Sequence, residues 1–331
     1  MSATCELPEA FIQRFGAGTI YNDLNPPSLG SDDEISWALL NYICNQSRSA
    51  MAQFGAKSVR VLPVLLPKFE PRAFVYWSRD MPHDYVISLN SGTAEVLRKE
   101  LIEAEVLSLL PKDSRALRSL HVDDLINFAI TSVLATILHH ESAHIVKFHF
   151  PFLLECKCAD PNTFARFQAL CEIDADKLAS QLISIQLLDF AKGVADACGL
   201  PNCVDSVLNE VYVLYAVALH IWFSVFNRMP MPKASIYPHP LIRAARIAVG
   251  AADNDPSASN DLALTFSRGM YVLKGLANAD EKISRSRSFE QRPFDLFDEM
   301  TLLNKKFEPL FAELDPKLVD VRRRWLLQEK G

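Results

Sequence analysis

The sequence has no excess of positive charge. Its 34 lysine and arginine residues are outnumbered by 40 aspartate and glutamate residues, which gives a formal net charge of −6. Proteins that bind nucleic acid carry a basic surface, and proteins held to anionic lipid by charge alone carry one too. The composition therefore argues against a nucleic-acid partner and against attachment to a membrane by charge.

The chain also lacks the sequence signs of export. Its first residues contain no basic stretch followed by an apolar one, so we expect no signal peptide. The seven cysteines are an odd number in a long chain, which does not indicate a disulfide scaffold. Cys156 and Cys158 could bind a second metal, but two ordinary loop cysteines are the simpler interpretation. A reducing cytoplasm is the expected location.

The apolar run from Val211 to Phe226 is too short to span a membrane. It has 16 residues, interrupted only by His220 and Ser224, whereas a transmembrane helix needs about 20. We interpret the run as a helix buried in the protein core. A short or re-entrant membrane segment is the alternative.

The sequence does contain enough apolar material for a large core. Apolar residues make up 49% of the chain and charged residues 22%, as in soluble globular proteins. Three strand-like runs at 58–66, 73–77 and 85–89, with prolines nearby, indicate a small sheet. From about residue 122 the pattern is mostly helical, so we predict an α+β protein that is predominantly α. Helices are expected at about 33–54, 93–110, 124–147, 161–190 and 205–226, and from 240 onward.

Two histidines on one predicted helix have the spacing of metal ligands. His140 and His144 are four residues apart, which puts both imidazoles on one helix face, one turn apart. The same face carries the apolar Val133 and Ile137, so it points toward the core. A catalytic zinc needs nitrogen ligands fixed in this way on a rigid element. Glu141, about 100° around the helix from His140, can reach a metal-bound water without being a ligand itself.

A pair of carboxylates on the next long helix can complete this site. Glu172 and Asp176 are four residues apart and share a helix face, and Glu172 lies 28 positions after His144. We predict that Glu172 is the third ligand. Asp176 is predicted to accept the free ring N–H of a ligand histidine. An exposed acidic stripe is the alternative for the two carboxylates. Their position after the helix that carries His140 and His144 favours ligation.

Three neighbouring groups fit this site less well. His149 lies five residues after His144, whereas the metzincin pattern has its third histidine six residues after and a glycine in between. His139 points to a different face of the helix. Asp174 lies about 200° around an ideal helix from Glu172. We therefore do not expect these three groups to be ligands.

The HExxH motif followed by Glu172 in a Glu-x-x-x-Asp setting resembles the gluzincin class of zinc peptidases. The Glu-x-Asp-Ala-Asp-x-x-Ala sequence that begins at Glu172 is similar to the HtpX/Oma-like branch of that class. The likeness extends to a Tyr-Pro-His-Pro sequence containing Tyr237 and His239, and to Arg243, since a His-Pro and a downstream arginine close the active site in that branch. The helical body and the expected cytoplasmic location also resemble the Lit-type phage-exclusion peptidases. The motifs cover about residues 133–246.

This resemblance implies a zinc-dependent endopeptidase that hydrolyses peptide bonds of a protein substrate, with one Zn²⁺ per chain. Glu141 would activate a zinc-bound water. His239 is the first candidate to stabilise the tetrahedral oxyanion, with Tyr237 and Arg243 as further candidates. A helix cap before a proline is an equally weighted interpretation of His239. The strand-like segment 85–89 could bind an extended substrate by strand addition, as peptidases of this class do.

Two other functions remain open. One is a membrane-associated zinc peptidase with residues 211–226 embedded, and the other is a non-catalytic metal-binding module that acts through protein interaction. Glu141 argues against the second, because a structural metal site has no use for it. We expect three consecutive parts. They are an N-terminal α/β part with the small sheet (1–118), a helical, zincin-like metallopeptidase core (119–252) and a helical C-terminal extension (253–331).

Overall fold

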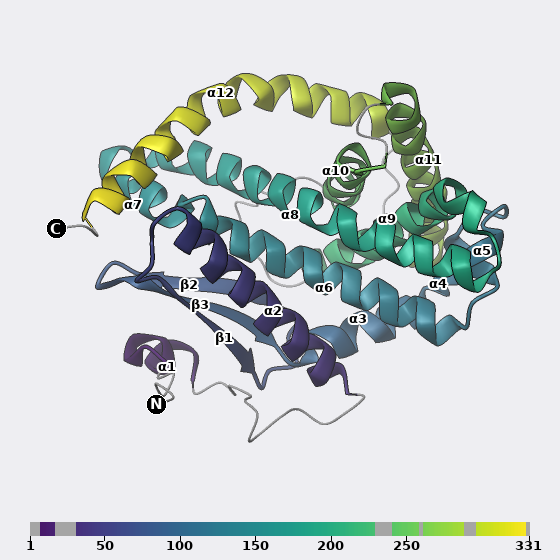
Figure 1. The fold of residues 1–331 in the computed structure, drawn as a ribbon, viewed down its shortest axis with the longest axis horizontal. Helices are drawn as coiled ribbons and strands as arrows, with labels where there is room; N and C mark the ends of the chain where they lie inside the picture. The colour runs from purple at the N-terminus through teal and green to yellow at the C-terminus, as the bar shows by residue number, and fades with distance from the viewer. Residues whose placement is uncertain (1–6, 17–30, 229–239, 258–260, 288–295, 329–331) are drawn as a thin grey trace. The chain divides into compact units, whose positions relative to one another are not determined.

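The structure, a computed structural model, describes residues 7–16, 31–228, 240–257, 261–287 and 296–328 (Figure 1). Most of these residues are helical, and three strands form one small mixed sheet. The predicted α+β class with predominant α structure is therefore confirmed.

The sheet has an order that differs from the order of its strands in the chain. Its strands are β1 (Arg60–Leu66), β2 (Ala73–Ser78) and β3 (Met81–Asn90). β3 lies in the middle, parallel to β1 and antiparallel to β2. The segment 85–89, which we expected to offer a free edge to substrate, therefore belongs to the central strand and is paired on both sides. That expectation is wrong, and the edge strands are β1 and β2.

Helices cover both faces of this sheet. The N-terminal helix α1 (Glu9–Phe15) packs Phe11 against apolar side chains of β1 and β3 such as Leu62 and Val86. The long helix α2 (Asp32–Gln53) packs against β1, on the opposite side of the sheet from α1 (Figure 1). Because both faces are covered, β1 is an almost unbroken apolar run rather than an alternating one.

Two long helices and the short helix between them carry the predicted site residues. The helix α6 (Val122–Val146) ends where Phe148 adopts a left-handed backbone conformation with φ of 61°. The short helix α7 (His149–Ala159) follows at once, so the residue after Phe148 starts a new helix instead of continuing α6. The helix α8 (Pro161–Ala197) begins after Asp160, whose carboxylate caps it by accepting the N–H of Thr163.

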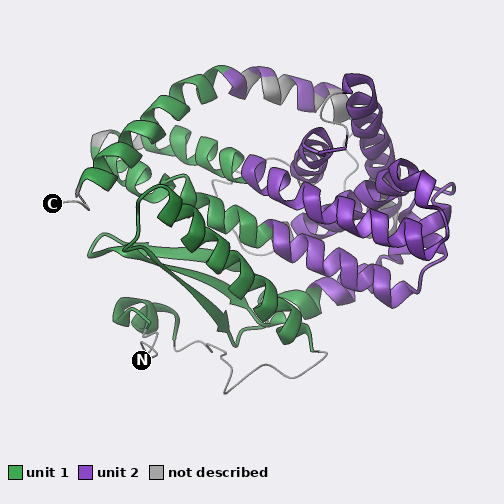
Figure 2. Ribbon diagram, in the orientation of Figure 1, with its two compact units in different colours: residues 1–96, 137–175, 309–331 green, residues 97–136, 176–308 purple. Residues whose placement is uncertain are grey.

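The described helices and strands group into two compact units (Figure 2). Unit 1 holds residues 1–96, 137–175 and 309–331, and unit 2 holds residues 97–136 and 176–308. The unit boundaries fall within four helices, which are α6, α8, α3 (Gly92–Glu103) and α12 (Leu296–Gln328). The three consecutive parts expected from the sequence remain a prediction, since compactness alone does not define a domain that folds independently.

Unit 2 contains three helices that pack on one another. They are α9 (Val204–Arg228), α10 (Pro240–Asp253) and α11 (Leu262–Arg287).

By length and composition, α6 and the segment Pro201–Val225 could each cross a membrane. The second segment is 89% buried inside the protein, which favours our interpretation of it as a core helix. Core helices of soluble proteins pass the same test, so neither segment shows where in the cell the protein is located. Short helices of unit 2 are α4 (Val106–Leu109), α5 (Arg115–Arg118) and η1 (Pro201–Cys203).

Candidate metal centre

The last turns of α6 bring the two motif histidines together. His140 and His144 are both buried, and their Nε2 atoms lie 3.2 Å apart. The two rings meet edge to face, with their centroids 4.9 Å apart. Both side chains therefore direct the same ring nitrogen toward one point, as the four-residue spacing predicts.

The third member of the cluster comes from α8. One carboxylate oxygen of Glu172, Oε2, lies 3.1 Å from Nε2 of His140, and the other, Oε1, lies 3.8 Å from Nε2 of His144. The three side chains offer ligand atoms that all lie within 4.8 Å of one another. All three belong to unit 1. The prediction that they form a group able to hold a metal ion is confirmed.

These separations fit one metal ion at the centre of the cluster. Ligand atoms about 2.0–2.1 Å from a tetrahedral zinc lie about 3.3 Å from each other. The separations of 3.1 and 3.2 Å, from Nε2 of His140 to Oε2 of Glu172 and to Nε2 of His144, are close to that value. The separation of 3.8 Å joins Nε2 of His144 to the other carboxylate oxygen, Oε1. Two imidazole nitrogens and a carboxylate suit zinc, and they also suit other divalent first-row metals. The geometry supports a metal site without fixing which metal occupies it.

Glu141 is held by the edge strand of the sheet. Its Oε2 accepts the main-chain N–H of Val75 over 2.9 Å. Along β2, Arg72 bonds toward β3 through its carbonyl, which accepts the N–H of Asn90. Main-chain groups alternate in direction along a strand, so those of Ala73, Val75 and Trp77 point to the free edge of the sheet. The carboxylate next to the metal cluster therefore lies against this edge.

Two residues that the sequence arguments had set aside adjoin the cluster. Nδ1 of His149 lies 3.0 Å from Nδ1 of His144, and Nε2 of His149 lies 3.2 Å from Oδ2 of Asp174. As expected, neither residue belongs to the group of metal-ligand side chains, but His149 contacts His144 from outside it. The helix α6 ends before His149, and Pro151 is the sequence signal of that break, since its ring and missing N–H do not fit a continuing helix.

The electrostatics of this pair favour a neutral imidazole and an ionised carboxylate. Burial lowers the pKa of His149, although the hydrogen bond and charge of Asp174 oppose the shift. Burial alone would raise the pKa of Asp174. The hydrogen bond from His149 and the charge of Lys147, 3.5 Å from Oδ1, outweigh burial and lower that pKa.

The remaining predicted site residues are placed as follows. Asp176 accepts two hydrogen bonds from Arg243, over 3.0 Å from Nε and 2.8 Å from Nη2. Both side chains are buried in unit 2, and Arg243 also lies over the ring of Phe223. The predicted role of Asp176 toward a ligand histidine stays a prediction. His239 and Tyr237 lie outside the described residues, so their proposed roles stay predictions too.

Among the described residues, the other histidine and cysteine candidates do not belong to a group of metal-ligand side chains. His139 is buried, which lowers its pKa to about 4, and its Nε2 has no hydrogen-bond partner within the described ranges. Cys156 is buried whereas Cys158 is exposed, because residues two apart on α7 point in different directions. Across the part of the chain that the structure describes, the cluster of His140, His144 and Glu172 is the one such metal-ligand group.

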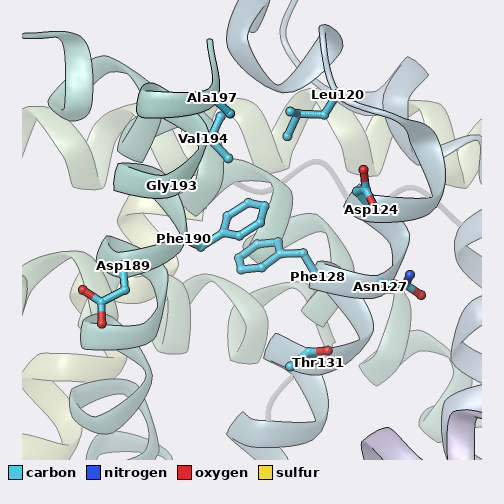
Figure 3. A pocket seen from close by; sticks show the side chains of 10 residues that line it. All are labelled: Leu120, Asp124, Asn127, Phe128, Thr131, Asp189, Phe190, Gly193, Val194 and Ala197. Carbon is cyan, nitrogen blue, oxygen red and sulfur yellow. The ribbon is translucent and has the colours of Figure 1, made fainter. Parts of the chain in front are cut away.

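Unit 2 has an open groove of about 610 Å³ (Figure 3). Its walls come from the N-terminal half of α6 and the C-terminal part of α8. The rings of Phe128 and Phe190 stack across it with centroids 3.5 Å apart, and Asp124 and Asp189 lie at its sides. None of the residues that line it is a predicted site residue.

We compared the chain with known protein families, proteins and solved structures. No family model, curated protein or solved structure matches this chain. The likeness to gluzincins therefore rests on the motif residues themselves.

Proposed function

We propose that this chain is a zinc-dependent endopeptidase, with His140, His144 and Glu172 as ligands and Glu141 as the general base. The observation that supports the proposal is the convergence of three ligand side chains. Nε2 of His140 lies 3.1 Å from Oε2 of Glu172 and 3.2 Å from Nε2 of His144, and the ligand atoms of the three residues all lie within 4.8 Å of one another. Three protein ligands are typical of a catalytic zinc, which keeps a fourth position open, whereas structural zinc sites use four.

The residues of the chain have separate roles in this reaction. When bound, zinc lowers the pKa of water and polarises the carbonyl that is attacked. Glu141 takes the proton of the attacking water and passes it to the leaving amine. The Val75 N–H fixes one carboxylate oxygen of Glu141, so the base is held in place before substrate arrives.

The free edge of β2 is the proposed binding surface for substrate. An extended peptide can add to an exposed sheet edge through main-chain hydrogen bonds, which give affinity without sequence preference. Main-chain groups of Ala73, Val75 and Trp77 face this edge, and Glu141 already contacts it at Val75. A peptide bound there would pass beside the general base. The substrate is thus a protein segment able to become extended, and a cytoplasmic location belongs to the same proposal.

The experiment measures zinc content and peptide cleavage on the same samples. Wild type, Glu141→Gln and Glu103→Gln are purified with zinc and tested on a mixture of unstructured peptides by mass spectrometry. Glu103 is an exposed glutamate at the end of α3 and serves as the matched control. We expect about one zinc per chain in all three proteins. Cleavage should fall by about 10²–10⁴-fold in Glu141→Gln alone, the usual contribution of a general base.

Two results would overturn the proposal. Absence of zinc from all three proteins would remove the metal site. Zinc in wild type without cleavage of any peptide would instead favour a non-catalytic metal-binding module. A requirement of wild type for detergent to stay monodisperse would contradict the cytoplasmic location and favour the membrane-associated peptidase.

A further inference from the structure

We infer that Asp174 and His149 are positioning residues that fix the tautomer of His144, so that its Nε2 presents a lone pair to the metal position. The inference deepens the proposed function, because it takes the cluster of His140, His144 and Glu172 to be the metal site. It concerns two residues that touch no ligand atom directly. They act through a single chain of hydrogen bonds that runs from α8 through the first residue of α7 to α6.

The chain of hydrogen bonds starts at the carboxylate. An ionised carboxylate can only accept, so the nitrogen of His149 that lies 3.2 Å from Asp174, Nε2, must carry the proton. The other ring nitrogen of His149, Nδ1, lies 3.0 Å from Nδ1 of His144, and only one of these two atoms can donate in that hydrogen bond.

The second step concerns the proton between His149 and the ligand His144. Nε2 of His144 lies at the metal position and would bind metal through its lone pair, so the proton of this ring is on Nδ1. Nδ1 of His149 then accepts that proton, and the proton of His149 is on Nε2, facing Asp174. The lone pair of His144 is on Nε2. Nε2 is the atom that lies 3.2 Å from His140 and 3.8 Å from Glu172. Each donor along the chain meets an acceptor, and the lone pair on Nε2 of His144 points to the metal position.

The placement of His149 indicates that this arrangement is more than packing. Its side chain has no exposed surface. An apolar residue at this position would fill the same space without the cost of burying an ionisable pair. The position of His149 also depends on Phe148, whose left-handed backbone conformation is unfavourable for a residue other than glycine. Metal-binding histidines usually donate their second ring N–H to a carboxylate or carbonyl, and here a neutral histidine relays that role.

The test compares two substitutions of His149 of different hydrogen-bonding ability. His149→Asn keeps an acceptor oxygen near the place of Nδ1, whereas His149→Leu keeps bulk and removes the acceptor. Zinc affinity is measured by competition with a chelator. We expect His149→Leu to lower affinity by about 10–100-fold, the usual effect of losing such a partner, and His149→Asn to recover most of it. Equal affinity in both variants would overturn the inference.

A second readout requires neither metal nor activity. Nitrogen-15 NMR of histidine-labelled, metal-free wild type reports which ring nitrogen of His144 carries the proton. We expect Nδ1 in wild type and in His149→Asn, and a shift of the proton toward Nε2 in His149→Leu. A proton on Nε2 of His144 in wild type would overturn the inference, even if neither variant folds.

The two readouts separate this inference from the proposed function. Wild type that has the expected tautomer, binds zinc and cleaves nothing supports the positioning role and contradicts the peptidase. Wild type that cleaves peptides with the opposite tautomer contradicts the positioning role alone.

Discussion

The main-chain N–H of Val75 donates a hydrogen bond to Oε2 of Glu141 over 2.9 Å. The donor belongs to the edge strand β2, and the acceptor is the second residue of the HExxH motif on α6. The bond joins elements 66 positions apart in the chain, so it fixes the motif helix against the sheet. The same strand edge is the one we propose for substrate.

Val75→Pro should lower activity without removing the metal. Proline removes the N–H and fixes φ near −65°, and an edge strand tolerates it because that N–H takes no part in the pairing with β3. A hydrogen bond to a charged group contributes about 1.5–3 kcal/mol, so kcat/KM should fall by about tenfold or more. Zinc content should stay at the wild-type level.

Val75→Ala is the matched control for this substitution. It removes most of the side chain and keeps the N–H, so its kcat/KM should stay near wild type. Equal losses in the two variants would show that the side chain of Val75, and not its N–H, supports the activity.

Removing Arg243 should destabilise the protein strongly. Its guanidinium makes two hydrogen bonds to the buried carboxylate of Asp176, and Arg243→Leu would remove both of them. We expect the free energy of unfolding in urea to fall by about 3–5 kcal/mol. The double variant Asp176→Leu/Arg243→Leu should recover most of the loss, because both charges are then gone.

The double variant also tests the catalytic role suggested for Arg243. A stable double variant with normal cleavage would assign this pair to stability. A stable double variant without cleavage would support a role of Arg243 or Asp176 at the active site. Unchanged stability in Arg243→Leu would contradict the buried ion pair.

The cysteines should differ sharply in reactivity. Burial raises the pKa of the Cys44 thiol to about 12 and raises that of Cys171 as well, so neither forms the reactive thiolate at pH 8 in the folded protein. Cys158 and Cys203 are exposed. Iodoacetamide at pH 8, read by mass spectrometry, should alkylate Cys158 and Cys203 in the folded protein and the other two only after unfolding.

The same shift has a consequence for stability. The folded state keeps the Cys44 proton to a higher pH than the unfolded state, so this thiol should destabilise the protein as pH rises from about 9 toward 12. Cys44→Ala should reduce that loss in urea titrations. Fast alkylation of Cys44 in the folded protein would contradict its burial.

Local patterns predicted the helices and strands because they depend on neighbouring residues. The strand-like runs and the HExxH helix follow from apolar runs and periodicity, and the ligand spacing of four residues follows from one helical turn. The order of the sheet did not follow, because it depends on pairing between distant segments. The segment 85–89 looked like any other apolar strand, and only the pairing with β1 and β2 made it central.

The supporting residues of the site could not be predicted for a different reason. The spacing of His149 from His144 was compared with a pattern for metal ligands, and such a pattern says nothing about residues that contact a ligand from outside. The angle between Asp174 and Glu172 on an ideal helix likewise argues against a shared ligand position and does not exclude a contact with His149. Both Glu172 and Asp174 lie inside unit 1, since other elements pack around this part of the helix.

The central claim is that two histidines and one glutamate hold a single metal ion. Zinc X-ray absorption spectroscopy of the zinc-loaded protein tests it most directly, with Glu172→Gln and the exposed Asp196→Asn as paired variants. The account predicts one zinc per chain, with two imidazoles and oxygen donors at about 2.0–2.1 Å. It also predicts that Glu172→Gln loses the metal and Asp196→Asn keeps it. Sulfur donors at about 2.3 Å, or zinc retained equally by both variants, would contradict the account.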